Sequence, residues 1–409
     1  MAKDPIQLGE HGHWLDLAGC GRDAWNTWAE KELKKPFEQR KTIDLENVEI
    51  KHSDFSAFKF PGRLNFSSAQ FPRGVDFSSA KFHGHAYFSR AHFGEDFSFL
   101  GSEFVDDATF QRTIFEGTVD FKSARFAERK RCFFGGAQFG AHVLFNCSEF
   151  CGPASFSSAA FAEAEFIAAC FQAGADFDRS VFAADACFRS VRFLSADYKH
   201  ATFCELALFD DAEFTQPPDF YGTSFRQPPS FLDTTFCFHK AKDSSARYRL
   251  LKRYAAEAQD HESELTLFAL ETKAKRGHLL KWGRPKTWLE LVLNHLYELT
   301  SDYGRSVLRP AIALLLTLAI AARAIALLAG ASGDPWTWPK PIWLAAWSNL
   351  LPFVGLSATG RQVMETGVCR ADAACVARLY AISSVETFFA IIFLFLLGFG
   401  LRNLFRVNK

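Results

Sequence analysis

Few residues of this chain have the types and spacing that catalysis or metal binding needs. Four of the twelve histidines form two alternate pairs, His11 with His13 and His83 with His85, and neither pair has a third ligand close by in the sequence. The ten cysteines include no CxxC motif and no Cys/His spacing of the zinc type. No Ser/His/Asp set, no pair of catalytic carboxylates and no phosphate-binding loop stands at usable spacing. We therefore expect no enzyme, no catalytic residue, no metal and no cofactor.

One apolar stretch, "WTWPKPIWLAAWSNLLPFVGLSATG", carries groups that coordinate ions or water. Hydroxyl and amide side chains, or backbone carbonyls around an axis, can replace the hydration shell of an ion. The pore or filter candidates in this stretch are Ser348, Asn349, Pro352, Phe353, Val354, Gly355, Leu356 and Ser357.

Two charged residues, Arg323 and Glu386, interrupt the apolar segments on either side of that stretch. At 1.5 Å per helical residue, Arg323 lies ~21 Å beyond Arg309, and Glu386 lies ~24 Å from Arg402. An isolated charge in hydrocarbon is costly, so we predict an intramembrane ion pair between them. Structural and vestibule-lining roles are both open for this pair, and we favour the structural one.

Two segments that position these residues are long enough to cross a bilayer, 311–330 and 380–401. The basic residues that flank them are Arg305, Arg309, Arg402, Arg406 and Lys409. The positive-inside rule places both flanks in the cytoplasm and the loop between the spans outside. In an oxidising outer space, Cys369 and Cys375 are expected to form a disulfide.

The proline-containing segment 341–359 is apolar enough to enter the bilayer. If it crossed, the basic C-terminal residues would lie outside, so a re-entrant helix followed by a loop fits better. The order of span, re-entrant helix, loop and span resembles the two-helix pore module of tetrameric cation channels. In that resemblance Val354 and Gly355 occupy the filter, but the potassium-selective T-x-G-Y-G motif is absent. The alternative is an amphipathic anchor that fills the gap between the spans.

A ladder of phenylalanines fills the first half of the chain. From Phe55 to Phe126 the spacing alternates between five and six residues, and after a slip around Phe133 and Phe139 it resumes to Phe236. Tyr198 takes one rung. Neither 3.6 nor 2.0 residues divides this spacing, so the pattern indicates a repeat architecture.

The residue two places before most rungs is small or β-branched, as at Ala80 and Val119, and therefore points inward with the rung. "AQFPRGVDFSSAKFHGHAYFSRAHF" resembles the pentapeptide-repeat family in its Phe-centred variant. The resemblance implies a right-handed, four-sided β-helix over residues 41–240, with about eight or nine coils and a length of ~40 Å.

We divide the chain into four parts: an N-terminal helical cap (1–40), the β-helix (41–240), an amphipathic helical linker (241–304) and a membrane domain (305–409). The β-helix carries 26 acidic and 19 basic residues. We expect no nucleic acid as a partner, and this modest acidic excess gives only weak support to a β-helix that itself mimics DNA.

Two classes of function fit these parts. The first is an oligomeric ion-channel-like pore, a tetramer being favoured, with the β-helix as cytosolic sensor or vestibule. The alternative is a membrane-tethered scaffold whose β-helix binds a cytosolic protein and transports nothing. In both cases we expect a multi-pass protein of a bacterial inner (plasma) membrane, with both termini cytoplasmic.

Overall fold

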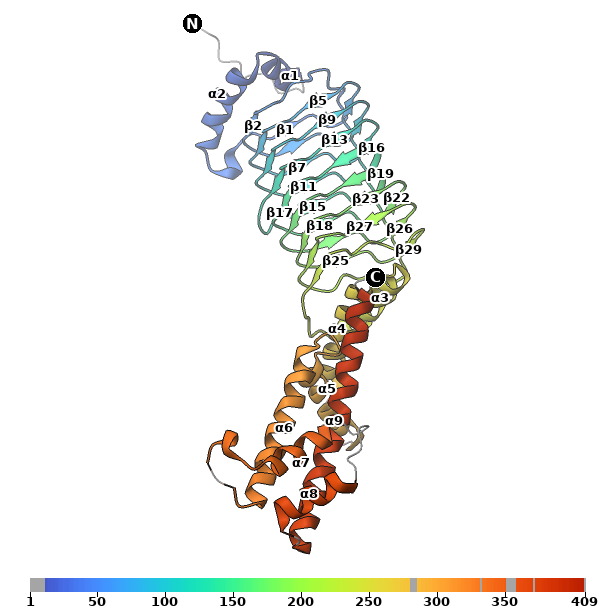
Figure 1. The fold of residues 1–409 in the computed structure, drawn as a ribbon. Coiled ribbons are helices and arrows are strands. Elements are labelled where there is room, and N and C mark those ends of the chain that lie inside the picture. Colours follow the sequence, from blue (N-terminus) through green and yellow to red (C-terminus); the bar gives the residue numbers. More distant parts are fainter. Residues whose placement is uncertain (1–11, 280–284, 332, 351–357, 371, 408–409) are drawn as a thin grey trace. The chain divides into compact units, whose positions relative to one another are not determined.

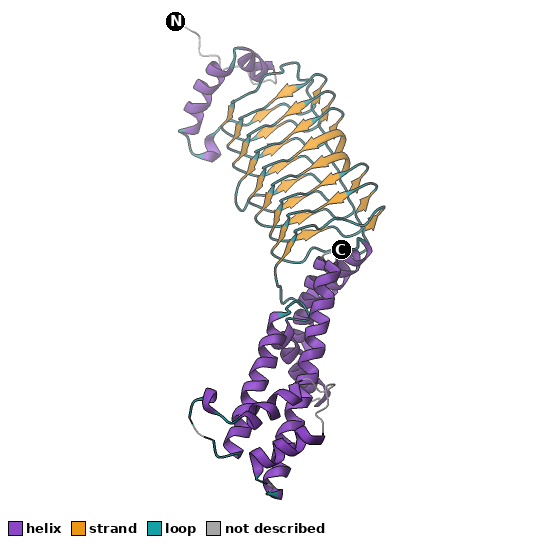
Figure 2. Ribbon diagram, in the orientation of Figure 1, coloured by secondary structure: helices purple, strands orange, loops and turns teal. Residues whose placement is uncertain are grey.

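The fold is that of a computed structural model, which describes residues 12–279, 285–331, 333–350, 358–370 and 372–407 (Figure 1). The chain divides into two compact units, with the boundary between Ala274 and Lys275. The first unit is a β-solenoid of about nine turns with helices at both ends, and the second is helical (Figure 2). The predicted fold class, a β-solenoid followed by a helical region with two apolar helices, is confirmed.

Helices cover the first coil of the solenoid. They are α1 (Gly12–Gly19), α2 (Arg22–Leu33) and the 3-10 helix η1 (Phe37–Gln39). The ring of Trp25 lies 5.4 Å from that of Phe58, and its Nε1 donates a hydrogen bond to the carbonyl of Lys59 at 2.8 Å. The amide of Asn26 donates to the carbonyl of Ala57 and accepts from the N–H of Lys59. Helix α2 therefore satisfies polar backbone groups that an open solenoid end would expose.

The solenoid consists of short parallel strands that stack from coil to coil. One sheet contains β1 (Ile43–Asp44), β3 (Leu64–Asn65), β7 (Ala86–Tyr87), β11 (Ala108–Thr109), β15 (Cys132–Phe133), β18 (Ala154–Ser155), β21 (Ala175–Asp176) and β25 (Ala196–Asp197). A second contains β2 (Lys59–Phe60), β6 (Lys81–Phe82), β10 (Glu103–Phe104), β14 (Arg125–Phe126), β17 (Glu149–Phe150), β20 (Cys170–Phe171), β24 (Arg192–Phe193), β28 (Glu213–Phe214) and β30 (Thr235–Phe236).

The remaining strands form two columns that are joined by two longer strands. One column contains β4 (Gln70–Phe71), β8 (His92–Phe93), β12 (Ile114–Phe115), β16 (Gln138–Leu144), β19 (Ala160–Glu165), β22 (Val181–Phe182), β26 (Thr202–Phe203) and β29 (Ser224–Phe225). The other contains β5 (Val75–Asp76), β9 (Phe97–Ser98), β13 (Val119–Asp120), β23 (Ala186–Cys187) and β27 (Ala207–Leu208). Because β16 and β19 pair with strands of both columns, the four columns belong to three hydrogen-bonded sheets.

The register shows where the ladder slips. Ala86 pairs with Ala108, 22 residues on, but Ala108 pairs with Cys132, 24 residues on. The two extra residues lie before the rung that the sequence places around Phe133. The structure gives this rung to Phe134, which is fully buried and stacks on Phe110 with ring centroids 4.7 Å apart. The two inserted residues thus lengthen a turn, and the rings before and after this turn still stack on one another.

Stacked aromatic rings form the core of the solenoid. Phe121 is fully buried, with Phe99 on one side at 4.8 Å and Phe145 on the other at 4.9 Å. Small buried residues such as Ala80 and Ala124 share the interior with the rings. Tyr198 occupies its predicted rung, 4.9 Å from Phe177 and 5.0 Å from Phe220. The distance between neighbouring coils matches the distance at which aromatic rings stack. The same repeat therefore allows both the hydrogen bonds between strands and the stacking of the rings in the core.

Two helices close the other end of the solenoid, α3 (Ser244–Glu257) and α4 (His261–Leu279). The ring of Tyr254 lies 5.1 Å from that of Phe225 in one of the last coils. The buried hydroxyl of Tyr248 donates to the carbonyl of Cys237 at 2.7 Å and accepts from the N–H of His239 at 3.0 Å. Burial raises the pKa of Tyr248 from its ordinary value of 10 to about 12.

The helical unit contains two helices that are long and apolar enough to cross a membrane. These are α6 (Leu308–Leu328) and α9 (Ala373–Val407), which include the predicted spans 311–330, in all but its last two residues, and 380–401. The other elements are α5 (Pro285–Ser301), the 3-10 helix η2 (Pro335–Thr337), α7 (Lys340–Leu350) and α8 (Ala358–Cys369). Helix α9 is longer than its predicted apolar part because the flanking segments 373–379 and 402–407 are helical as well.

The turn between α5 and α6 packs against the second half of α9. Gly304 has a φ of +85°, and a Cβ atom there would lie 2.4 Å from the ring of Phe399. Asn403 donates a hydrogen bond to the carbonyl of Gly304 at 3.1 Å. On α9, Gly400 approaches the carbonyl of Ser306, whereas a Cβ atom added at Gly398 would meet no described atom within 4 Å. Of the two glycines of α9, Gly400 therefore permits the close approach of the two segments.

Candidate functional site

Helix α7 packs against both apolar helices through small side chains. Ala345 and Ala346 on α7 are fully buried, and so are Ile325 and Ala326 on α6. Small residues let helix backbones approach closely in an apolar environment. This packing fixes the position of the last turn of α7, where the polar candidates begin.

A buried polar cluster lies where the last turn of α7 meets α9. The amide nitrogen of Asn349 donates to Oε2 of Glu386 at 3.1 Å, to Oγ of Ser383 at 3.0 Å and to the carbonyl of Ala345 at 2.8 Å. Ser383 and Glu386 are buried and stand three residues apart, on one face of α9. Glu386 Oε1 is also buried and has no hydrogen-bond partner among the described residues.

The other pore candidates divide into two groups. The hydroxyl of Ser348 donates to the carbonyl of Ala345 within its own helix at 2.8 Å and does not join the cluster in this structure. The remaining candidates lie outside the described residues; they are Pro352, Phe353, Val354, Gly355, Leu356 and Ser357.

Arg323 and Glu386, which the sequence predicts to form an ion pair, do not contact each other in the part of the chain that the structure describes. The guanidinium of Arg323 is exposed and lies over the ring of Trp338, 5.6 Å from its centroid, while Glu386 binds Asn349. Helical rise predicts the height of a residue but not the direction in which it points. On α6 the face toward its partners is occupied by residues such as Ala322 and Ile325, so Arg323 points elsewhere.

A groove of about 660 Å³ runs between α6 and α9 beside the cluster. Glu386 and Thr317 are its polar lining residues, and the apolar ones include Leu316, Ile320 and Phe389. A concave, mainly apolar site with few polar groups is typical of ligand-binding sites. The groove thus places an apolar surface next to the buried carboxyl group.

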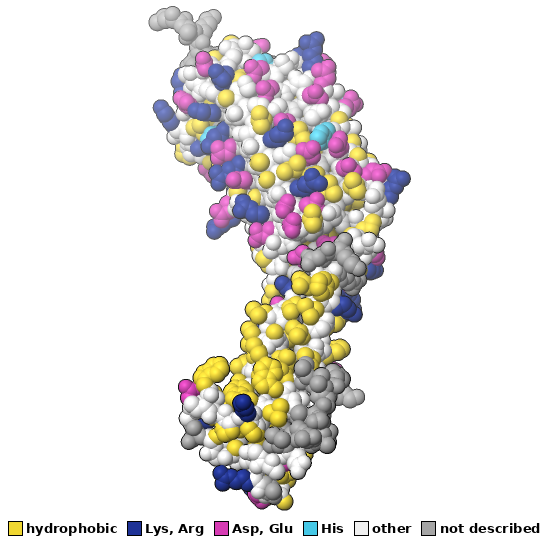
Figure 3. Space-filling model, viewed as in Figure 1, with side chains coloured by type: hydrophobic (Ala, Val, Ile, Leu, Met, Phe, Trp, Pro, Cys, Tyr) yellow, Lys and Arg dark blue, Asp and Glu magenta, His cyan; other side chains and the backbone are white. Residues whose placement is uncertain are grey.

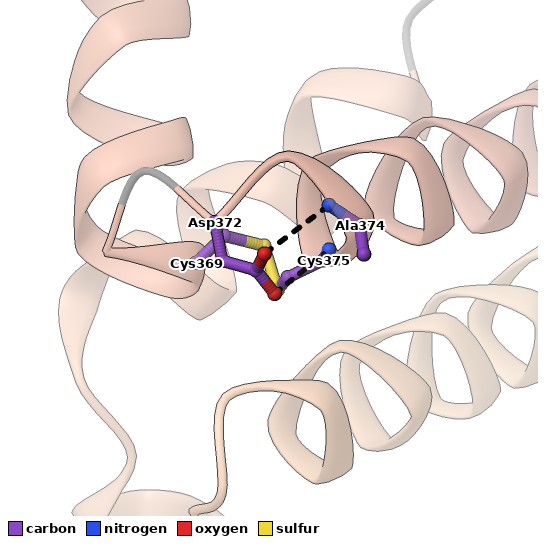
Figure 4. The surroundings of a disulfide bond; sticks show 4 residues. All are labelled: Cys369, Asp372, Ala374 and Cys375. Atoms are coloured by element: carbon purple, nitrogen blue, oxygen red, sulfur yellow. Dashed lines mark hydrogen bonds between the residues drawn. A yellow bond between two sulfur atoms is a disulfide. The ribbon is translucent and has the colours of Figure 1, made fainter.

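The predicted cysteine pair lies at the junction of α8 and α9. Cys369 and Cys375 form a disulfide with their Cα atoms 5.4 Å apart (Figure 4). The carboxylate of Asp372 accepts hydrogen bonds from the N–H groups of Ala374 and Cys375, at 3.3 and 3.2 Å (Figure 4). The disulfide and this helix cap together hold the tight turn into α9.

The comparison with protein families concerns the solenoid. Residues 66–114 match the family model described as "Pentapeptide repeats (9 copies)". The chain carries pentapeptide repeats. The matched residues include the regular rungs from Phe66 to Phe110, which lie before the two-residue insertion. No curated protein and no solved structure matches the chain.

A polar cluster on the pentapeptide-repeat solenoid was missed by the sequence reasoning. Nε2 of His85 lies 3.4 Å from Oδ2 of Asp106, and its Nδ1 lies 3.8 Å from Oδ2 of Asp107. Lys130 pairs with the other oxygen of Asp106, and the N–H of Arg131 binds Asp107. These residues come from successive coils, so only the coil length of about 22 residues could have identified them. A lysine in the cluster already balances part of the acidic charge.

Proposed function

We propose that this chain is a membrane-anchored pentapeptide-repeat protein whose helical unit assembles as a homo-oligomer, a tetramer being favoured, into an ion-conducting pore. The observation that carries the proposal is the position of α7. This short helix packs against two helices of membrane-spanning length and directs the Asn349 amide to a buried carboxyl group of α9.

The membrane location is supported by the surface of α6 and α9. In the most apolar 18-residue stretch of each helix, only 28% of α6 and 17% of α9 is buried within the chain. A core helix of a soluble protein is mostly buried. Large exposed side chains include Leu315 and Ile320 on α6, and Phe388 and Phe395 on α9. On the face drawn in Figure 3, hydrophobic side chains gather over the helical unit, whereas acidic and basic side chains alternate over the solenoid. A lipid bilayer satisfies such an apolar helix surface.

The pore is supported by the length of α7. Its 11 residues span ~16 Å, about half of a bilayer core, so α7 alone does not cross the membrane. Buried polar residues inside membrane segments are costly and commonly line ion pathways. A single copy of two spans and one short helix encloses no channel, so a pore of this type requires several copies around one axis.

The solenoid then belongs to the cytoplasmic part of the protein. This assignment rests on the basic residues just before and at the start of α6, Arg305 and Arg309, and on Arg402 near the end of α9. In the proposed assembly the solenoids act as sensor or vestibule, and α3 to α5 link them to the pore.

The test is ion flux through proteoliposomes that contain the purified full-length chain. The wild type should conduct, and Asn349→Ala should change the ion preference or lower the flux, because the cluster loses its hydrogen-bond donor. Ser384→Ala is the matched control. Ser384 lies next to Ser383, but it is exposed and bonds only to Tyr380 of its own helix among the described residues, so its loss should leave flux unchanged.

A second candidate function, the membrane-tethered scaffold, is favoured by a groove on the solenoid. This groove of about 850 Å³ is lined by residues of successive coils, among them Ser89, Arg90, Gln111 and Arg112. Exposed arginines and hydroxyl groups suit a protein partner with acidic side chains. An absence of flux from a correctly oriented, verified oligomer would favour this function over the pore.

A further inference from the structure

The carboxyl group of Glu386 has an unusual environment for an acidic side chain. The residue is only 2% exposed, and one of its oxygens accepts a hydrogen bond from Asn349 while the other has no partner among the described residues. Its neighbours along the groove between α6 and α9 are Val385, Ile382 and Phe389. A buried, ionised carboxylate without a counter-charge is strongly disfavoured, so this group needs a cation or a proton.

The charged residues of the surrounding helices do not supply that cation. On α6, Arg309 pairs with Asp302 and Arg323 stacks on Trp338. On α7 the charged residue is Lys340, at the opposite end of the helix from Asn349. On α9 the nearest basic residues along the helix are Arg378 and Arg402, ~12 and ~24 Å away by helical rise. The acidic residues Glu298 of α5 and Glu365 of α8 bond to Arg276 and Tyr380, respectively. Within the described chain, no ion pair reaches Glu386.

We propose that Glu386, Ser383 and Asn349 form a binding site for one small monovalent cation, a proton or an alkali-metal ion, that is reached from the α6–α9 groove. All three residues belong to one chain, so the site does not depend on the oligomeric pore. Glu386 Oε1 and Ser383 Oγ offer oxygen lone pairs, which hard cations prefer. Asn349 holds the other carboxylate oxygen and so fixes the orientation of the group.

A hydrophobic carbodiimide tests this site on the full-length chain in liposomes. Dicyclohexylcarbodiimide adds to a protonated carboxyl group, and the adduct rearranges to a stable N-acylurea without a leaving group. Mass spectrometry of the peptides should find the label on Glu386 and none at that position in Glu386→Gln, which keeps the shape and an acceptor for Asn349. The exposed Glu290 of α5 is the internal control and should react far more slowly.

The two cations are distinguished by the conditions of labelling. For a proton site, the rate should fall about tenfold per pH unit above the titration midpoint and be unaffected by sodium or potassium. For an alkali-metal site, sodium or potassium should in addition protect Glu386 at constant pH, whereas choline at the same concentration should not. Asn349→Ala should then weaken the protection.

Labelling of Glu386 that neither pH nor cations change would overturn the proposal. So would an absence of label on Glu386 in protein whose intact fold is verified by its thermal unfolding. A second readout needs no variant: an alkali-metal ion that binds the folded state should raise the Tm of the wild type relative to choline. A failed flux assay together with cation-sensitive labelling would reject the pore and keep this site.

Discussion

The solenoid and the helical unit are stabilised in opposite ways. In the solenoid, one residue type at one spacing is repeated, and each ring meets equivalent rings of the coils above and below. In the helical unit, each important contact is made once, by unlike residues, such as Asn349 with Glu386 or Gly304 with Phe399. A repeated core can be read from a periodicity, whereas a core of single contacts depends on which way each side chain points.

The largest effect should follow from removing a ring in the middle of the solenoid. Phe121→Ala leaves a cavity between five aromatic neighbours and should lower the free energy of unfolding by about 3–5 kcal/mol. These neighbours are Phe99, Phe110, Phe126, Phe134 and Phe145. Chemical denaturation followed by circular dichroism would measure it. Phe238→Ala, at a half-exposed position outside the ladder, is the control and should cost far less. Equal losses in the two variants would mean that the stacked rings are not the main source of stability.

A single-contact site in the helical unit should give the next largest effect. Gly304→Ala places a Cβ atom against Phe399 at a positive φ, so we expect a loss of about 2 kcal/mol or more. The thermal unfolding midpoint in detergent would report it. Gly398→Ala is the matched control on α9, because no described atom lies within 4 Å of the added Cβ; it should be neutral or gain about 0.5–1 kcal/mol.

Replacing each of two buried tyrosines of the first unit by phenylalanine should have different effects on the free energy of unfolding. Tyr248→Phe removes two hydrogen bonds that join α3 to the end of the solenoid and should cost about 1–3 kcal/mol. The hydroxyl of Tyr198 is buried without a partner among the described residues, so Tyr198→Phe should be neutral or stabilise by about 1 kcal/mol. Denaturation midpoints of the two variants provide the measurement. Destabilisation by Tyr198→Phe would contradict this interpretation of the rung.

The pKa of Tyr248 gives a pH dependence with a defined sign. Because burial raises this pKa to about 12, the folded state holds the phenolic proton more tightly than the unfolded state does. The resulting stability is fully present below pH 10 and is lost as the pH rises from about 10 to 12. Tyr248→Phe should therefore show a shallower loss of stability over this range in pH-dependent denaturation.

The smallest effect is expected for an exposed ion pair between coils. Lys81 and Glu103 lie 2.6 Å apart and are each more than a third exposed, so Lys81→Ala should change stability by no more than about 0.5 kcal/mol. In the helical unit, Arg276 pairs with Glu298 in a more buried position, and Arg276→Ala should cost more. Thermal unfolding at low and high salt would compare the two pairs, since screening weakens mainly the exposed one.

The solenoid could be predicted from the sequence because its spacing is redundant. Each rung is supported by its neighbours, so even Tyr198 could be assigned to the ladder. The sequence locates the slip in the ladder to within one residue of Phe134. It does not show that Phe134 takes the rung, because Phe133 and Phe134 fit the spacing equally well. The cluster of His85 and Asp106 was not predicted, because its residues lie on successive coils and come together only when the exact length of each coil is known.

In the helical unit, the two apolar helices and the cysteine pair could be predicted from the sequence, but the partner of Glu386 could not. The spacing along a helix gives the distance of Arg323 and Glu386 from the flanking arginines, but it does not give the direction of either side chain. The direction of a side chain is set by packing, and here Ala345 and Ala346 bring Asn349 to Glu386 instead. The filter candidates from Pro352 to Ser357 remain a prediction from sequence.

Single-channel recording in a planar lipid bilayer tests the central claim of a pore most directly. The full-length chain should give discrete steps of ionic current, and Glu386→Gln should change their amplitude or ion preference while Ser384→Ala should not. A verified oligomer that inserts into the bilayer and gives no current steps under any ion gradient would contradict the pore.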